Sequence, residues 1–106
     1  RKPRALRYST FTGLTTRAIE ARQRHYYPTL EAQKDAGASF TDAERITGLI
    51  PETWYGVPLG LGEGWEARPF GLLSYESFPQ DAFPPDRRRI LDALASLLAL
   101  ALKAQA

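Results

Sequence analysis

The C-terminal segment constrains the fold of this chain most, because it predicts a helix with more apolar surface than one neighbour can cover. Pro85 suits the first position of a helix and Asp86 suits its positive end, so we expect the helix to run from about Pro85 to Lys103. Its apolar residues form two neighbouring stripes, one at positions 90, 94, 97 and 101 and the other at positions 91, 98 and 102. A helix that packs on a single surface needs a narrower stripe. We therefore expect a sheet to cover one stripe, and the same helix of a second copy, or a helix of the parent protein outside this sequence, to cover the other.

The second stripe makes Leu91, Leu98 and Leu102 candidate residues of a homodimer interface. Each fully buried leucine gains about 1.5–3 kcal/mol, so leaving this stripe exposed would lose several kcal/mol and favour aggregation. The plainer alternative is a leucine-rich helix buried in the core of a monomer. The width of the apolar surface favours the dimer.

Alternating residues before this helix predict an antiparallel hairpin. Its strands are expected at Thr53–Leu59 and Phe70–Ser77, and Gly60, Gly62 and Gly64 mark the turn between them. Pro58 indicates that part of the first strand lies at an edge or a bulge. The near-continuous apolar run of the second strand indicates that both of its faces are covered.

The first half of the chain predicts shorter elements. We expect strands at Leu6–Phe11 and Arg24–Tyr27, with a short helix between them that begins at Thr15 or Thr16. The fold class that follows is α+β, with helices packed on an antiparallel sheet.

The segment Leu30–Leu49 is polar and carries few apolar anchors. We expect it to be the most mobile part of the chain. Thr41, with Glu44 three residues later, has the pattern of a capping box and predicts one helical turn there.

Length and composition indicate one small globular domain. The chain has 106 residues, a formal net charge of +2, and ordinary fractions of hydrophobic and charged residues, 43% and 25%. Basic residues do not gather into a nucleic-acid footprint, and no run of about 18 apolar residues is present, so we expect a cytoplasmic domain that binds neither nucleic acid nor a membrane. The sequence has no methionine, so we expect it to be part of a longer protein.

Five segments, in order and at similar spacing, resemble GAF domains. They are Gly13-Leu14, Tyr26-Tyr27-Pro28, Val57-Pro58-Leu59, Phe70-Gly71-Leu72-Leu73, and Phe83 followed by Asp86 and Leu91-Asp92-Ala93-Leu94-Ala95. The resemblance implies a GAF- or PAS-like sheet. GAF domains usually carry an N-terminal helix and one or two strands ahead of the first of these segments, and we expect those to be missing. Residues 1–106 are thus identified as a single, partial GAF-like domain.

The same resemblance implies a sensory or regulatory domain of a bacterial-type signalling or transcription-regulatory protein. Such a domain would bind a small molecule, relay a signal through a C-terminal dimer helix to a neighbouring output domain, or do both. The candidate ligand-binding residues are Trp54, Tyr55 and Tyr75 as aromatic walls, with Arg45 and Thr47 as polar contacts. The alternative is a dimerisation module whose degenerate pocket is filled by Trp54, Tyr27 and Phe40.

Residues for chemistry are few, so we expect no enzyme activity, no metal site and no cofactor. The chain has no cysteine, which free methionine sulfoxide reductases of the GAF family use, and its single histidine leaves no choice of base. His25 as a haem ligand is an alternative, but a lone histidine in an aromatic strand is more often structural. The run Arg87-Arg88-Arg89 indicates a solvated helix face, with a patch for an anionic partner as the alternative.

Overall fold

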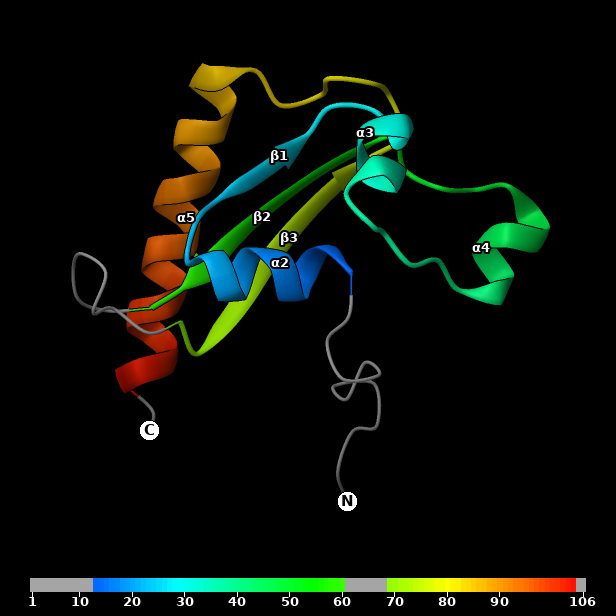
Figure 1. The fold of residues 1–106 in the computed structure, drawn as a ribbon. Helices are drawn as coiled ribbons and strands as arrows, with labels where there is room; N and C mark the ends of the chain where they lie inside the picture. Colours follow the sequence, from blue (N-terminus) through cyan, green and yellow to red (C-terminus); the bar gives the residue numbers. More distant parts are fainter. Residues whose placement is uncertain (1–12, 61–68, 105–106) are drawn as a thin grey trace.

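A computed structural model describes residues 13–60 and 69–104 of the chain (Figure 1). The elements follow in the order α2 (Leu14–Ala21), β1 (His25–Tyr27), α3 (Leu30–Asp35), α4 (Asp42–Thr47), β2 (Thr53–Leu59), β3 (Gly71–Ser77) and α5 (Pro85–Ala104). The arrangement is α+β, as predicted from the sequence. The strand expected at Leu6–Phe11, and most of the glycine-rich turn, lie outside the described residues.

The three strands form one antiparallel sheet with β2 in the middle. The predicted hairpin is confirmed, since Thr53 pairs with Ser77 and Leu59 with Gly71. Strand β1 pairs only with residues 54–56 of β2. Pro58 lies beyond that reach and faces only β3 within the described residues, which explains how a central strand accommodates a residue without an N–H donor.

Helix α5 packs on one face of the sheet and forms the main core with it (Figure 1). Alternate residues of β2 point to this face, so Tyr55, Val57 and Leu59 all reach the helix. They meet Ala95 and Ala99, each only 2% exposed. These small side chains let the helix approach the strands closely, and the predicted helix from Pro85 is confirmed.

The other face of the sheet is crossed by α2, which buries Leu14 and Ala18 (Figure 1). Trp54 belongs to this face, and its ring lies beside that of Tyr27, with a centroid distance of 5.8 Å. The ring also covers Gly56, two residues along the same strand. Bulky side chains of the sheet itself therefore fill the space above β2 on this side.

Two expectations for the first half of the chain were wrong in detail. Helix α2 begins after Gly13, which has no side chain to cap the helix and has a positive φ of 80°, and Thr15 and Thr16 lie inside the helix. The polar segment holds two helices, α3 and α4, where one turn was predicted. Thr29 caps α3 by accepting a hydrogen bond from the Ala32 amide.

The capping box of α4 is confirmed, since Thr41 and Glu44 each accept a hydrogen bond from the other's backbone amide. Strand β3 differs from expectation: Ser74 and Glu76 are exposed, so one of its faces is open to solvent. Within the described part of the chain, no helix is long and apolar enough to cross a membrane.

Candidate functional site

A row of three tyrosines crosses the sheet on the face that α5 covers. Tyr26 of β1 is the register partner of Tyr55 in β2, which is in turn the partner of Tyr75 in β3. The rings of Tyr26 and Tyr55 meet edge to face at 5.9 Å, and those of Tyr55 and Tyr75 stack at 6.2 Å. Cross-strand aromatic pairs of this kind stabilise a sheet beyond their buried area.

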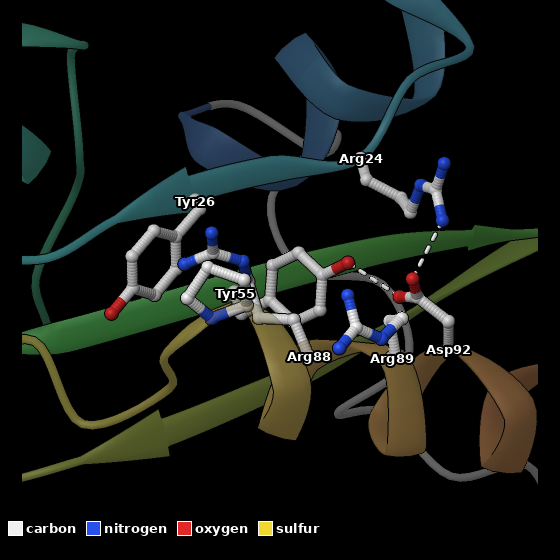
Figure 2. Close-up of a pocket in the computed structure, with 7 residues that line it drawn as sticks. Arg24, Tyr26, Tyr55, Arg88, Arg89 and Asp92 are labelled. Carbon is white, nitrogen blue, oxygen red and sulfur yellow. Dashed lines mark hydrogen bonds and ion pairs between the residues drawn. The ribbon is translucent and has the colours of Figure 1, made fainter.

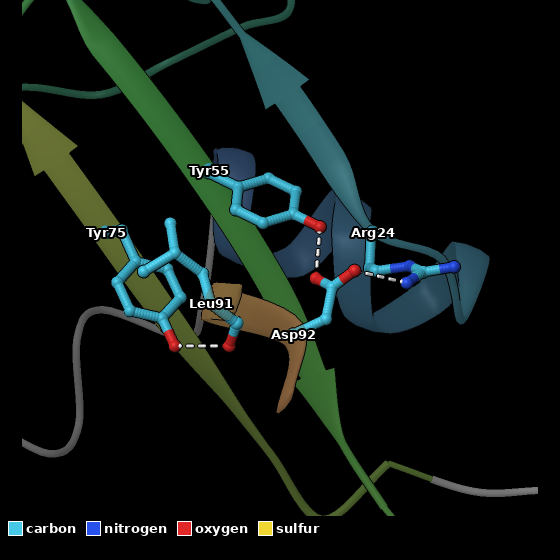
Figure 3. A network of polar contacts seen from close by, with 5 residues as sticks. All are labelled: Arg24, Tyr55, Tyr75, Leu91 and Asp92. Carbon is cyan, nitrogen blue, oxygen red and sulfur yellow. Dashed lines mark hydrogen bonds and ion pairs between the residues drawn. The ribbon is translucent and has the colours of Figure 1, made fainter. Parts of the chain in front are cut away.

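The hydroxyl groups of all three tyrosines end on α5 or on the loop before it. Tyr75 donates a hydrogen bond of 2.8 Å to the backbone carbonyl of Leu91, and Tyr55 donates to Asp92 Oδ1 (Figure 3). Tyr26 donates a bond of 2.6 Å to Asp81, which precedes the helix. The position of α5 on the sheet is therefore fixed by polar bonds as well as by apolar packing.

Asp92 connects three elements through one carboxylate. Its Oδ1 accepts the phenol of Tyr55, and its Oδ2 lies 2.6 Å from Nη1 of Arg24, just before β1 (Figure 3). The ion pair is partly solvated, since the Arg24 side chain is 59% exposed and that of Asp92 is 23% exposed. Such a pair is held by geometry more than by deep burial, so a competing ligand has access to it.

A pocket with a volume of about 350 Å³ opens beside this contact, between the sheet and the first turns of α5 (Figure 2). The residues that line it combine aromatic rings with charged groups: Arg24, Tyr26, Tyr55, Pro85, Arg88, Arg89 and Asp92. This volume is at the small end of the range for ligand sites.

The arginines of the pocket differ in how they are held. The guanidinium of Arg88 lies 4.1 Å from the centroid of the Tyr26 ring and donates a 2.7 Å bond to the carbonyl of Phe83. The guanidinium of Arg89 has no hydrogen-bond or ion-pair partner among the residues the structure describes. Among the described residues, Arg88 is thus stacked on a ring, Arg24 is paired with Asp92, and Arg89 has no partner.

Burial changes the acidity of the tyrosine row. Burial first, and then the hydrogen bond to Asp92 and the charge of that carboxylate, raise the pKa of Tyr55 to about 12 from an ordinary 10.0. Burial also raises the pKa of Tyr26 and of Tyr75. All three phenols therefore remain protonated donors at neutral pH.

The structure separates the ligand residues predicted from sequence. Tyr55 and Tyr75 lie together in the row, but Trp54 points to the opposite face of the sheet. Arg45 and Thr47 lie on the exposed helix α4, away from the sheet (Figure 1). Arg45 pairs with Asp42 there, and the Thr47 hydroxyl donates to the carbonyl of Ala43.

Sequence reasoning missed most of the pocket. Arg24, Tyr26 and Asp92 were not singled out as binding residues, and Arg24 and Asp92 are 68 positions apart in the chain. The run Arg87–Arg89 was the available signal, because two of its members, Arg88 and Arg89, line the pocket.

The candidate dimer residues also lie differently from the expectation. Leu91 and Leu98 are partly buried and pack against the core of their own chain. Leu102 is 46% exposed, and the open stripe contains Ile90, Leu94 and Leu97, which are 51–63% exposed. The helix is rotated so that the sheet covers the stripe that was assigned to the partner.

His25 does not form part of a metal cluster within residues 13–60 and 69–104, where no three acidic or histidine side chains gather. Its Nδ1 lies 3.3 Å from the hydroxyl of Tyr27. Burial, and secondarily the positive charge of Arg17, lower the pKa of His25 below 6.5.

Comparison with known proteins gives likeness of structure but not of sequence. No protein family model matches the chain, and no curated protein matches it. The fold is similar to a solved structure of a GAF domain, with 17% identity, a TM-score of 0.60, and coverage of 83% of this chain and 44% of that one. It is similar also to a type II free methionine-R-sulfoxide reductase from Thermoplasma acidophilum, with 19% identity, a TM-score of 0.60, and coverage of 83% and 54%. The chain thus spans about half the length of these structures.

The reductase corrects one expectation from the sequence. The prediction that this chain is not an enzyme is contradicted, because a protein with the same fold is a reductase. A fold fixes the backbone, whereas chemistry depends on the side chains placed on it, so enzyme activity is compatible with this architecture. The antiparallel sheet, the helix packed across it and these two likenesses together identify the fold of this chain as GAF-like.

Proposed function

We propose that this domain is a sensory or regulatory module that binds a small molecule in the pocket between the sheet and α5. The observation that carries the proposal is the tyrosine row, whose hydroxyls all bond to α5 or to the loop before it. A molecule in the pocket would touch Tyr26, Tyr55 and Asp92, which are the groups that hold the helix. Binding would therefore change the equilibrium position of α5.

Helix α5 is the element that would carry this change to a neighbouring output domain of a cytoplasmic signalling or transcription-regulatory protein. It is the last described element and is 20 residues long. A rigid helix transmits a displacement at one end to the other, as in helix shifts that couple domains. The GAF-like fold supports this role by analogy.

Hydrogen exchange tests the proposal directly. A small-molecule screen by thermal shift would first find compounds that raise the melting temperature. We expect a true ligand to slow amide exchange in residues 85–104, and to do so less in Tyr55→Phe, which lacks the hydroxyl that reaches Asp92. Tyr27→Phe is the matched control, because Tyr27 belongs to the other face. Ligands that protect only α2 and the Trp54 face would contradict the proposal.

A second candidate function, dimerisation through α5, is favoured by the exposed stripe. Ile90 and Leu97 are each 63% exposed and Leu94 is 51% exposed. Exposed isoleucine and leucine side chains grouped on one helix are unusual for a monomer and suit an isologous contact with a second copy. The two functions are compatible, because the pocket and this stripe lie on different sides of the helix.

A further inference from the structure

The charges of the pocket are unbalanced. Three guanidinium groups, from Arg24, Arg88 and Arg89, line the pocket with the single carboxylate of Asp92, which leaves an excess of two positive charges among the lining residues (Figure 2). Guanidinium groups bind carboxylates and phosphates through paired N–H donors, and bind them more strongly than neutral groups do. A neutral ligand would leave this excess uncompensated.

Asp92 itself marks where an anion can bind. Its Oδ2 accepts from Arg24 at 2.6 Å while its Oδ1 accepts from Tyr55, so one oxyanion already sits between a guanidinium and a phenol. An incoming carboxylate or phosphate would present the same acceptors to Arg24. Arg89 supplies a second guanidinium that has no partner in the described structure.

The aromatic walls limit the rest of the ligand. The Tyr26 ring, with Arg88 stacked 4.1 Å from its centroid, and the Tyr55 ring give the pocket flat apolar surfaces. The volume of about 350 Å³ suits a small molecule.

We propose that this pocket, if it is the ligand site of the function proposed above, takes a small molecule with a carboxylate or phosphate group, which displaces Asp92 from Arg24. The anion then bridges Arg24 and Arg89, and the freed carboxylate loosens the tie between α5 and the strands. The replacement of Asp92 by the ligand's anionic group at Arg24 thus accounts for both the ligand class and the release of the helix.

NMR titration of the full chain with inorganic phosphate, benzoate and neutral benzamide, at constant ionic strength, tests this inference. We expect phosphate and benzoate to give saturable shifts of the Arg24, Arg89 and Asp92 signals, and benzamide to give none. Arg89→Gln should raise the dissociation constant about tenfold. Arg87→Gln is the control, because Arg87 lies in the same turn but does not line the pocket, and it should change the constant by less than about twofold.

Asp92→Asn should change the dissociation constant for the anion in the opposite direction to Arg89→Gln. The amide keeps the shape and the acceptor for Tyr55 but removes the competing charge, so phosphate should bind about tenfold more tightly. Equal effects of Arg87→Gln and Arg89→Gln, or weaker binding in Asp92→Asn, would overturn the inference. The inference would also be overturned if benzamide shifted the Arg24, Arg89 and Asp92 signals and the anions did not. The proposal that the pocket senses a small molecule would then still stand. Loss of sensing itself would appear separately, as absent protection of residues 85–104 in the exchange experiment.

Discussion

The indole ring of Trp54 occupies the place where a side chain on Gly56 would project. A Cβ atom built on Gly56 would lie 2.3 Å from Cη2 of Trp54, far inside van der Waals contact. Trp54 is only 6% exposed and its ring lies beside that of Tyr27, so it cannot move away freely. At Gly56 the face of the sheet opposite α5 is therefore filled by the Trp54 ring, and the pocket described above lies on the α5 side.

Gly56→Ala should destabilise the domain by about 1–3 kcal/mol, the usual cost of overpacking a filled site. Chemical denaturation of the two proteins measures the difference. Gly71→Ala is the matched control in the neighbouring strand, since the nearest atom to its Cβ would be Leu59 Cδ1 at 3.9 Å, an ordinary contact. Equal stabilities for the two variants would show that Trp54 yields at little cost.

Tyr55 should ionise far above the ordinary tyrosine range. Its pKa is raised to about 12, mainly by burial, so the folded state keeps the neutral phenol after an unfolded chain would lose the proton. Stability from this group is thus complete below pH 10 and is lost as the pH rises towards 12. The difference in absorbance near 295 nm between the parent and Tyr55→Phe isolates this titration. Asp92→Asn should lower the pKa but leave it above 10.0, because burial remains. A phenol that titrates near 10.0 would contradict the burial.

The free energy of unfolding should fall as the pH drops through 6.5, in part because of His25. Burial lowers its folded pKa, so the unfolded state takes up the proton first and gains stability. Above 6.5 both states are neutral at this position and the contribution is constant. In His25→Gln, the denaturation midpoint should change less between pH 7 and pH 5 than it does in the parent. Parallel pH profiles for the two proteins would assign the loss to carboxylates instead.

Leu97→Glu and Leu98→Glu should have opposite consequences although the residues are adjacent. Leu97 is 63% exposed, whereas Leu98 packs on the core cluster. We expect Leu97→Glu to abolish a dimer while retaining the fold, and Leu98→Glu to lower stability by several kcal/mol through a buried charge. Sedimentation equilibrium with denaturation curves separates the effects. A parent chain that remains monomeric at high micromolar concentration would remove the dimer proposal.

The elements with long, regular patterns were predictable from sequence. A run of seven mostly apolar residues before a glycine-rich turn identified β2, and twenty leucine- and alanine-rich residues identified α5. Helix α3 was missed because its buried residue is polar: Gln33 is 4% exposed and donates to the carbonyls of Pro51 and Glu52. Those bonds depend on chain segments 18 and 19 positions away, which local periodicity does not contain.

The site was predictable only in part, for a geometric reason. Successive residues of a helix point about 100° apart, so the choice between Leu97 and Leu98 as the covered residue depends on helix rotation, which the two-stripe pattern leaves open. The pocket likewise depends on strand register, which places Tyr26 opposite Tyr55. The sequence pattern identified the arginine run Arg87–Arg89 but did not identify Asp92 as the carboxylate that lines the same pocket.

The tyrosine row ties α5 through oxygen atoms that contribute little to its packing. Replacing Tyr55 or Tyr75 by phenylalanine would preserve the ring and remove one hydrogen bond to the helix, and replacing Tyr26 would remove two hydrogen bonds to the loop before it. The strength of the attachment between α5 and the sheet can therefore be changed at three separate positions, each by removing one oxygen atom, while the shape of the core stays constant. Selection acting on these positions could tune how readily the helix responds without redesigning the domain.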